Sequence, residues 1–84
     1  MPYYVYILRS RNTGKFYIGS TKDLEDRLKC HNEGRSKYTK SGIPWELLYS
    51  EVHQDRSNAV KRENEIKGKK RKAYIEKLVR TSRM

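Results

Sequence analysis

The chain has 84 residues, which is enough for one domain and too few for two. It carries 20 Lys and Arg against 10 Asp and Glu, so its formal net charge is +10, and only 35% of its residues are apolar. The longest apolar run, residues 3–8, is far shorter than the roughly 20 residues of a membrane span, so we expect no membrane anchor. A surface this basic attracts polyanions, and the candidates are DNA, RNA and anionic lipid. Of these we expect nucleic acid as the partner and no membrane. The alternative is a charge excess that only keeps the protein soluble.

Cysteine usage indicates the compartment. Cys30 is the single cysteine, so an internal disulfide is impossible and a reducing compartment is favoured. No secretory signal is expected, because residues 1–2 lead directly into a strand-like stretch. We therefore expect a cytoplasmic protein with a single domain over residues 1–84 and its core at about residues 3–80. The sequence leaves the oligomeric state open, with a monomer favoured over an oligomer.

The sequence predicts three strands and three helices in the order β-β-α-β-α-α. Runs of β-branched and aromatic residues indicate the strands, and capping residues before apolar periodicity indicate the helices. The predicted strands are residues 3–8, 15–19 and about 45–53, with a turn at residues 11–14 and a basic loop at residues 35–43. The predicted helices are one capped by Thr21 or Asp23 and ended by Gly34, one capped by Asp55 or Ser57 that runs to about Lys67 and is interrupted at Gly68, and one at about residues 71–80.

The predicted hairpin has two unlike faces, because side chains alternate along a strand. One face is apolar and predicts a core, and tyrosines line the opposite face. Gly19 removes side-chain volume beside two phenols, so we expect it to be a structural member of a site with room for a ligand. Ordinary strand aromatics are the alternative for the tyrosines. The core face comprises Val5, Ile7, Phe16 and Ile18, and the opposite face comprises Tyr4, Tyr6, Tyr17 and Gly19.

Arg27 and His31 are neighbours on one face of the first predicted helix, because they lie four residues apart. At about 100° per residue they border the buried stripe of Leu24 and Leu28. Arg offers a fixed fork of donors to a phosphate, and His can donate, accept or carry a proton near neutral pH. The alternative is a partly buried Arg and a His bonded to a nearby carbonyl.

Glu63 is a charged residue that the helical pattern turns inward, to the side of Ala59 and Ile66. A carboxylate in such a position needs a cation or a metal ion as its partner. One carboxylate suits Mg²⁺, or Mn²⁺ in its place, because Mg²⁺ keeps most of its water ligands, whereas Zn²⁺ requires several Cys or His ligands. The alternative is a salt bridge to Arg27 or Lys67.

Two basic clusters, at residues 35–41 and 69–72, predict contact with a polyanion. The first interleaves cations with hydroxyls and an aromatic ring, a mixture that suits phosphate contacts that do not read sequence. A solvated surface is the alternative for each cluster. The predicted nucleic-acid-binding residues are Lys22, Arg35, Lys37, Tyr38, Lys40, Lys67, Lys69, Lys70 and Arg71.

Taken in order, these residues give the chain a resemblance to the GIY-YIG nuclease superfamily, and most of all to its small standalone members. The resemblance covers about residues 3–80. The matching residues are Tyr4-Val5-Tyr6 at the first triplet, with Tyr4 in place of its Gly, then Tyr17-Ile18-Gly19 at the second triplet, Arg27, His31 at a position used in some branches, and Glu63 within the segment 59–67 that resembles the metal-binding one.

The resemblance implies an α+β fold in which a three-stranded antiparallel sheet is flanked by helices. It also implies metal-dependent cleavage of nucleic-acid phosphodiester bonds, with DNA favoured over RNA and with selection by structure and not by sequence. Larger relatives, such as repair and homing endonucleases, select targets with extra domains. By position, Tyr6 or Tyr17 would orient or deprotonate the attacking water, with His31 beside them. Arg27 would stabilise charge on the phosphate, and Glu63 would hold Mg²⁺.

Two other functions stay open at this point. A non-catalytic module would keep the fold and bind nucleic acid in a salt-sensitive manner without any product. A module for anionic membranes or protein partners would bind these without competition from nucleic acid. The predicted helices are short and weakly apolar, which disfavours the membrane alternative.

Overall fold

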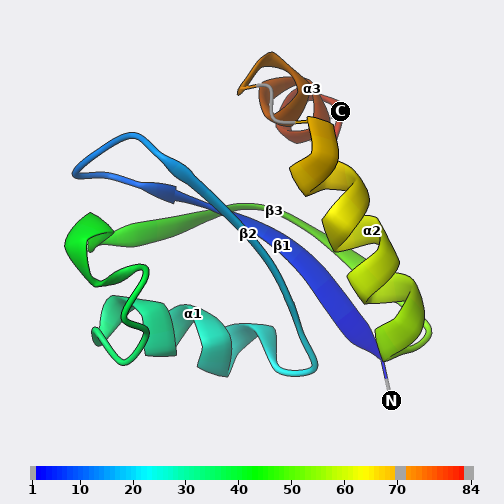
Figure 1. Cartoon of the computed structure of the whole chain (residues 1–84), viewed down its shortest axis with the longest axis horizontal. Helices are drawn as coiled ribbons and strands as arrows, with labels where there is room; N and C mark the ends of the chain where they lie inside the picture. Colours follow the sequence, from blue (N-terminus) through cyan, green and yellow to red (C-terminus); the bar gives the residue numbers. More distant parts are fainter. Residues whose placement is uncertain (1, 70–71, 83–84) are drawn as a thin grey trace.

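The computed structural model describes residues 2–69 and 72–82, and its strands and helices follow the predicted order β-β-α-β-α-α (Figure 1). The α+β class and the three-stranded antiparallel sheet are confirmed. Among the described residues, no helix is long and apolar enough to cross a membrane. The strands are β1 (Tyr3–Ser10), β2 (Phe16–Thr21) and β3 (Trp45–His53), the helices are α1 (Leu24–Asn32), α2 (Arg56–Lys69) and α3 (Lys72–Ser82), and a 3₁₀ turn spans Lys40–Gly42.

β1 is the central strand, and both neighbours run antiparallel to it in the order β2-β1-β3. The backbone N–H of Ser10 donates to the carbonyl of Lys15 at 2.8 Å, which closes the turn at residues 11–14. With this turn length Tyr6 stands directly opposite Gly19. In this register the apolar side chains of β1 and β2 lie together on one face of the hairpin, and the tyrosines lie on the opposite face. Both predicted faces therefore form.

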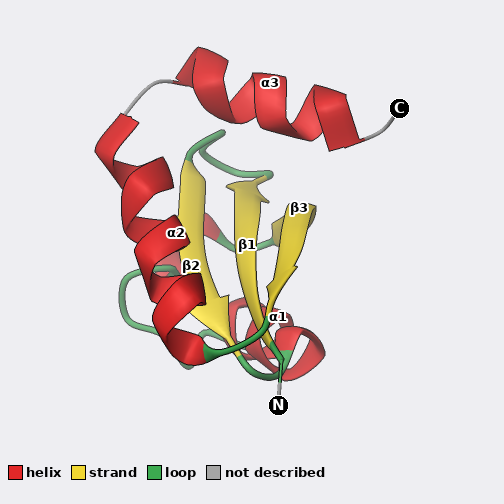
Figure 2. Ribbon diagram, turned by 90° about the vertical axis from the view of Figure 1, so that its right-hand side faces the viewer, coloured by secondary structure: helices red, strands yellow, loops and turns green. Residues whose placement is uncertain are grey.

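Helices cover both faces of the sheet (Figures 1 and 2). α1 packs on one face and α2 and α3 on the other, and α3 lies across the end of the sheet where β1 finishes. β1 serves both cores because its alternate side chains point to opposite faces, which explains its unbroken apolar run. The buried apolar residues are Val5, Ile7, Ala59, Ile66 and Ile75 on the α2 side, and Tyr6, Leu8 and Trp45 on the α1 side.

Aspartate side chains cap the starts of α1 and α2. Oδ1 of Asp23 accepts from the backbone N–H of Asp26 at 3.0 Å, and Oδ1 of Asp55 accepts from that of Asn58 at 2.9 Å. Each bond satisfies one of the N–H groups that a helix leaves unpaired in its first turn. Gly34, just past α1, has φ of +77°, a conformation that glycine adopts without strain. The predicted caps at the starts of α1 and α2 are therefore present, and so is the predicted stop at the end of α1.

Gly68 does not interrupt α2, contrary to the prediction. The helix runs through it to Lys69. Glycine weakens a helix interior by only about 0.5–1 kcal/mol relative to Ala, which is too little to end a helix held elsewhere. Ala59 and Ile66 hold α2 because both are buried against the sheet.

Replacing Gly68 with Ala should raise the free energy of unfolding by about 0.5–1 kcal/mol, because Ala is the better helix former. A Cβ at this position meets nothing within 4 Å. Gly34→Ala is the matched control and should lower stability by a similar amount, because Ala is strained at positive φ. Urea unfolding followed by circular dichroism measures both variants, and a destabilised Gly68→Ala would contradict the helical position of this residue.

Candidate active site

Tyr6 and His31 form the buried centre of the site. Tyr6, on the α1 face of β1, is 1% exposed, and His31, in the last turn of α1, is 0% exposed. The Tyr6 hydroxyl lies 3.1 Å from Nε2 of His31, and the ring centroid of Tyr17 lies 4.8 Å from that of the imidazole. The structure thus brings together the two phenols and the imidazole that the sequence singled out. The second ring nitrogen of His31 meets a hydroxyl, that of Thr39, and not the carbonyl that the alternative proposed.

Gly19 is needed because Tyr6 lies against it. A Cβ on Gly19 would stand 2.5 Å from the Tyr6 hydroxyl oxygen and 2.7 Å from Cζ of its ring, well inside van der Waals contact. The side chain of Tyr6 therefore fills the space that the sequence assigned to a ligand. The glycine acts by letting Tyr6 cross β2 to reach His31.

Burial sets the protonation states of this centre. Desolvation raises the pKa of Tyr6 to about 12, against the lowering effect of a hydrogen bond with Arg27. The nearby Tyr17 and Glu63 add smaller increases to the Tyr6 pKa. Desolvation first, and the charge of Arg27 second, lower the pKa of His31. At neutral pH the phenol of Tyr6 therefore holds its proton and the imidazole is neutral.

Glu63 approaches the same region from α2, on the other face of the sheet. Its Oε1 accepts from the Ser20 hydroxyl at 2.6 Å, and its Oε2 accepts from the Lys67 ammonium at 2.5 Å. The side chain is 15% exposed, so it faces inward as its helical position predicts. The salt bridge to Lys67, which the sequence left open as an alternative, is formed.

A hollow of about 390 Å³ joins the two faces of the sheet at the edge of β2. Arg27 from α1 and Glu63 from α2 both line it, because side chains from opposite faces can meet around an edge strand. Lys22 and Arg56 add two more cations. The arrangement gathers a guanidinium, a carboxylate and a cationic wall next to the buried phenol. The lining residues are Tyr3, Ser20, Thr21, Lys22, Arg27, Arg56, Val60 and Glu63.

The donor set of this hollow fits Mg²⁺ better than a metal held in a protein cage. Within residues 2–69 and 72–82, no three His, Cys, Asp or Glu side chains gather into a metal-binding group. Glu63 is a lone, partly exposed carboxylate in a cationic hollow. Mg²⁺ is bound through one or two carboxylates together with water and substrate phosphates, so the residues present fit this ion.

The predicted nucleic-acid-binding residues only partly gather at the hollow. Lys22 lines it, and Lys67 reaches it through the bond to Glu63. Others lie elsewhere. Nε of Arg35 pairs with Oε1 of Glu33 at 3.1 Å, and Nζ of Lys69 lies 5.8 Å from the ring centroid of Tyr74. The exposed residues on the loop after α1 are Lys37, Tyr38 and Lys40. Lys70 and Arg71 lie outside the described residues.

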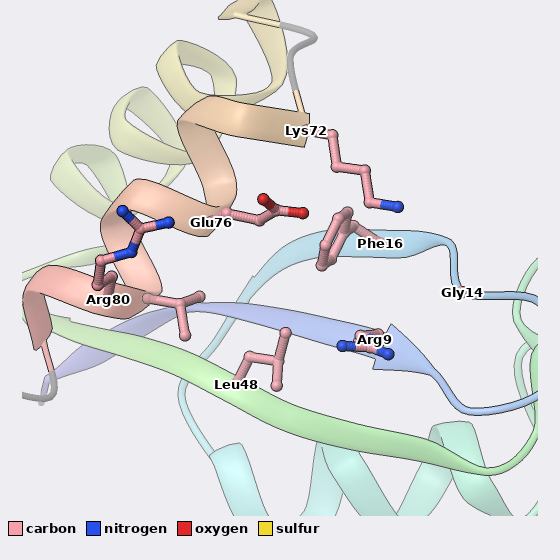
Figure 3. Close-up of a pocket in the computed structure, with 8 residues that line it drawn as sticks. Arg9, Gly14, Phe16, Leu48, Lys72, Glu76 and Arg80 are labelled. Atoms are coloured by element: carbon pink, nitrogen blue, oxygen red, sulfur yellow. The ribbon is translucent and has the colours of Figure 1, made fainter.

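Two other hollows differ from the one that Arg27 and Glu63 share, although Lys22 lines both that hollow and the first of these two. Tyr4 lines one of them beside Leu47, so its added bulk is not in the lining of the Arg27 and Glu63 hollow. The other, of about 520 Å³, lies between α3 and the sheet, where Glu76 points in from α3 (Figure 3). None of the predicted catalytic or metal-binding residues lines it. Of the predicted catalytic and metal-binding residues, Arg27 and Glu63 therefore lie together at the β2 edge.

Sequence reasoning missed three residues of the site. Arg56 lies seven positions before Glu63, so helical periodicity already places both on one side of α2. Side chains alternate along β2, and this alternation places the Ser20 side chain on the face of the sheet that α2 covers. Thr39, a member of the predicted polyanion-binding cluster at residues 35–41, is instead 1% exposed, and its hydroxyl lies 2.8 Å from Nδ1 of His31. A loop has no periodicity, so no signal in the sequence pointed to this contact.

Known proteins resemble this chain in sequence and in fold. The sequence profile of the GIY-YIG catalytic domain matches residues 2–77. A UPF0213 protein of Staphylococcus saprophyticus is 44% identical over 66 residues, which are 77% of this chain and 79% of that protein. A UPF0213 protein of Streptococcus agalactiae is 39% identical over 76 residues, 89% of this chain and 85% of that one. The solution NMR structure of a UPF0213 protein from Bacillus halodurans has a TM-score of 0.60 and 33% identity, covering 96% of this chain and 85% of that chain.

His31 should make the protein less stable in mild acid. Its pKa is lowered in the folded state, by burial first and by Arg27 second, so the unfolded chain binds a proton that the folded chain does not. The free energy of unfolding should therefore fall as the pH drops through the ordinary His pKa of 6.5 toward the folded-state value. Urea titrations of wild type and His31→Gln at about pH 7.5 and about pH 5.5 measure this loss.

His53→Gln is the matched control for this titration, because His53 lies on β3 and bonds to Glu51 at 2.9 Å, away from Arg27. In His53→Gln the free energy of unfolding should still fall in acid by the amount that His31 contributes. An unchanged pH dependence in His31→Gln would contradict the assignment.

Proposed function

This chain belongs to the GIY-YIG catalytic domain family, and on that premise we propose that it is a metal-dependent endonuclease that hydrolyses phosphodiester bonds of nucleic acid. One observation carries the proposal: Arg27 and Glu63, from helices on opposite faces of the sheet, line one hollow beside the buried phenol of Tyr6. A phosphate in that hollow would meet a guanidinium, a carboxylate and further cations together. Such a set positions the ester and stabilises charge that builds up on it.

Tyr6 and His31 support removal of a proton from the attacking water. A phenol with a raised pKa is a poor base by itself at neutral pH. His31 is neutral, and its Nε2 lies 3.1 Å from the phenol oxygen, so it can take the Tyr6 proton while Tyr6 takes one from water. Tyr17 is the more exposed of the two phenols, and we assign to it the orientation of the water.

Arg27 supports stabilisation of the phosphate. A hydrogen bond with Tyr6 raises its pKa above the ordinary value, so the guanidinium stays charged throughout the physiological range. Its side chain is exposed and lines the hollow, within reach of an entering anion. The planar fork can hold two phosphate oxygens at once, which is where negative charge develops during attack.

Glu63 would hold Mg²⁺ or Mn²⁺, and the Ser20 hydroxyl, at 2.6 Å, fixes the orientation of its carboxylate. When bound, the ion supplies Lewis-acid chemistry that polarises the phosphate and stabilises the leaving oxygen. The ammonium of Lys67, held against the carboxylate, brings another positive charge to the rim of the hollow.

In the proposed hydrolysis the water oxygen forms a bond to phosphorus, and the bond from phosphorus to the leaving oxygen breaks. One water proton passes to the pair of Tyr6 and His31, and the leaving oxygen takes a proton from solvent. Lys22 and Arg56 line the hollow as phosphate contacts, which favours selection by backbone shape over base sequence. We take DNA in preference to RNA as the substrate, in the cytoplasm.

Purified protein with Mg²⁺ or Mn²⁺ should nick DNA, and Glu63→Gln should slow the nicking by about a hundredfold or more. The expected loss reflects the several kcal/mol of transition-state stabilisation that a bound ion supplies. Binding of nucleic acid should survive, because the substitution removes no cation. Labelled duplex, branched and single-stranded DNA, with RNA of matched sequence, form the substrate panel.

Glu65→Gln is the matched control, because Glu65 lies two residues further along α2, pairs with Arg62 and is outside the lining of the hollow. It should keep the wild-type rate. Nicking by Glu63→Gln at the wild-type rate, or nicking that a chelator leaves unchanged, would refute the role of Glu63.

A non-catalytic nucleic-acid-binding module is the second candidate, and one observation favours it. Both carboxylate oxygens of Glu63 already accept hydrogen bonds, from Ser20 and from Lys67, which leaves fewer lone pairs for a metal ion. This candidate requires salt-sensitive binding and no product from any member of the substrate panel, whichever metal is supplied.

Arg56→Gln should weaken binding to all sequences alike, because both candidates place phosphates at the hollow. Loss of one phosphate contact should lower the slope of log affinity against log salt by about 0.7–0.9. Lys61→Gln removes a similar charge from α2 outside the lining of the hollow and should leave that slope nearly unchanged. Fluorescence anisotropy at several salt concentrations measures both, and equal slopes for the two variants would place the phosphate elsewhere.

A further inference from the structure

Thr39 contacts the imidazole of His31 at the ring nitrogen that does not face Tyr6. It belongs to the loop between α1 and β3 and is 1% exposed. Its Oγ1 lies 2.8 Å from Nδ1 of His31, while Nε2 of the same ring lies 3.1 Å from the Tyr6 hydroxyl. The buried imidazole is therefore held between two hydroxyl groups, one on each ring nitrogen.

The direction of these bonds follows from the remaining partner of Thr39. Its hydroxyl lies 3.4 Å from the backbone carbonyl of Ser36, to which it can donate its proton. With the proton on that side, the same oxygen accepts from His31, and Nδ1 carries the proton of the neutral ring. Nε2 is left with its lone pair, which points at the hydroxyl of Tyr6. The chain runs from the Tyr6 hydroxyl to Nε2, and from Nδ1–H to Thr39.

The loop that carries Thr39 is fixed independently of His31. Nε1 of Trp45 donates to the carbonyl of Thr39 at 2.7 Å, and the Ser10 hydroxyl donates to the carbonyl of Gly42 at 2.6 Å. Asn32 bonds to the backbone of Trp45 through its side-chain oxygen at 2.6 Å and its nitrogen at 3.0 Å. The Thr39 oxygen is therefore in place before any substrate arrives, which is what a group that selects a tautomer requires.

We propose that Thr39 is a positioning residue that holds His31 in the Nδ1–H tautomer, so that Nε2 can accept the proton of Tyr6. The catalytic consequence rests on the proposed nuclease function, whereas the tautomer does not. The Tyr6 O–H bond breaks as an N–H bond forms at Nε2, and water supplies the proton that restores the phenol. The imidazolium returns its proton through Tyr6 to solvent after the product leaves. In the opposite tautomer Nε2–H would donate to Tyr6 and no acceptor would remain.

Nitrogen NMR of the His31 ring in wild type, Thr39→Val and Thr39→Ser tests the proposal. Protonated and bare ring nitrogens have widely separated shifts, so the tautomer is read directly and without any activity. Wild type and Thr39→Ser should show Nδ1–H with bare Nε2. Thr39→Val, which keeps the backbone bond to Trp45, should show a mixture or the opposite tautomer. A bare Nδ1 in wild type, or the wild-type tautomer in Thr39→Val, would overturn the proposal.

Kinetics on the same variants test the consequence for catalysis. Thr39→Val should lower kcat by about a hundredfold, the lower end of what a positioned acid–base group contributes, and leave KM unchanged. Thr39→Ser should restore kcat. A folded Thr39→Val with wild-type kcat would overturn the positioning role. If wild type makes no product, the nuclease proposal fails by itself, and the ring shifts still decide the tautomer. If Thr39→Val does not fold, the ring shifts of wild type and Thr39→Ser decide it.

Discussion

The contact between the phenol of Tyr6 and the imidazole of His31 constrains most of this architecture. It joins the central strand to α1 across one face of the sheet, and both groups are buried there. An unsatisfied polar group in such a place would cost about 1–3 kcal/mol, so each ring fixes the position of the other. The contact also dictates Gly19 on β2, because no other residue leaves the phenol room to pass. The position of α1, and with it that of Arg27 one turn before His31, follows from this bond.

The second constraint is the attachment of α2 to both edges of the sheet. Glu63 bonds to Ser20 on β2, and the preceding residue, Arg62, bonds through Nε to both carboxylate oxygens of Glu51 on β3, at 3.0 and 3.1 Å. Two adjacent residues of one helix thus reach opposite edges, which fixes the rotation of α2 about its axis. Because β2 is an edge strand, the Glu63 carboxylate and Arg27, which come from opposite faces, can line one hollow at the edge of the sheet. The hollow is therefore a result of sheet order as much as of residue choice.

The sequence predicted those features that depend on local periodicity. Hairpin register follows from strand alternation and turn length, and the inward position of Glu63 follows from the helical period. Features set by packing between elements escaped it. The distance between Arg27 and Glu63 depends on the spacing of α1 and α2, which no local pattern encodes, whereas the ion pair of Glu63 with Lys67 follows from their i,i+4 spacing on α2. Likewise, packing between elements decides which side chain fills the space beside Gly19. The contact of Thr39 with His31 depends on the path of a loop that has no periodic pattern.

The distribution of charge explains how so thin a core can host an acid–base pair. Burying an ion without a partner is far more costly than burying a hydrogen-bonded neutral group, and a chain of this size has little stability to offset such a penalty. The buried groups are accordingly neutral, since Tyr6 is protonated and His31 is uncharged at neutral pH. The charged members, Arg27 and Glu63, stand where solvent reaches them, and Lys67 balances the carboxylate. Under the proposed function, charge would develop next to the buried pair only once a phosphate occupies the hollow, so the folded chain need not carry a buried ion at any earlier stage.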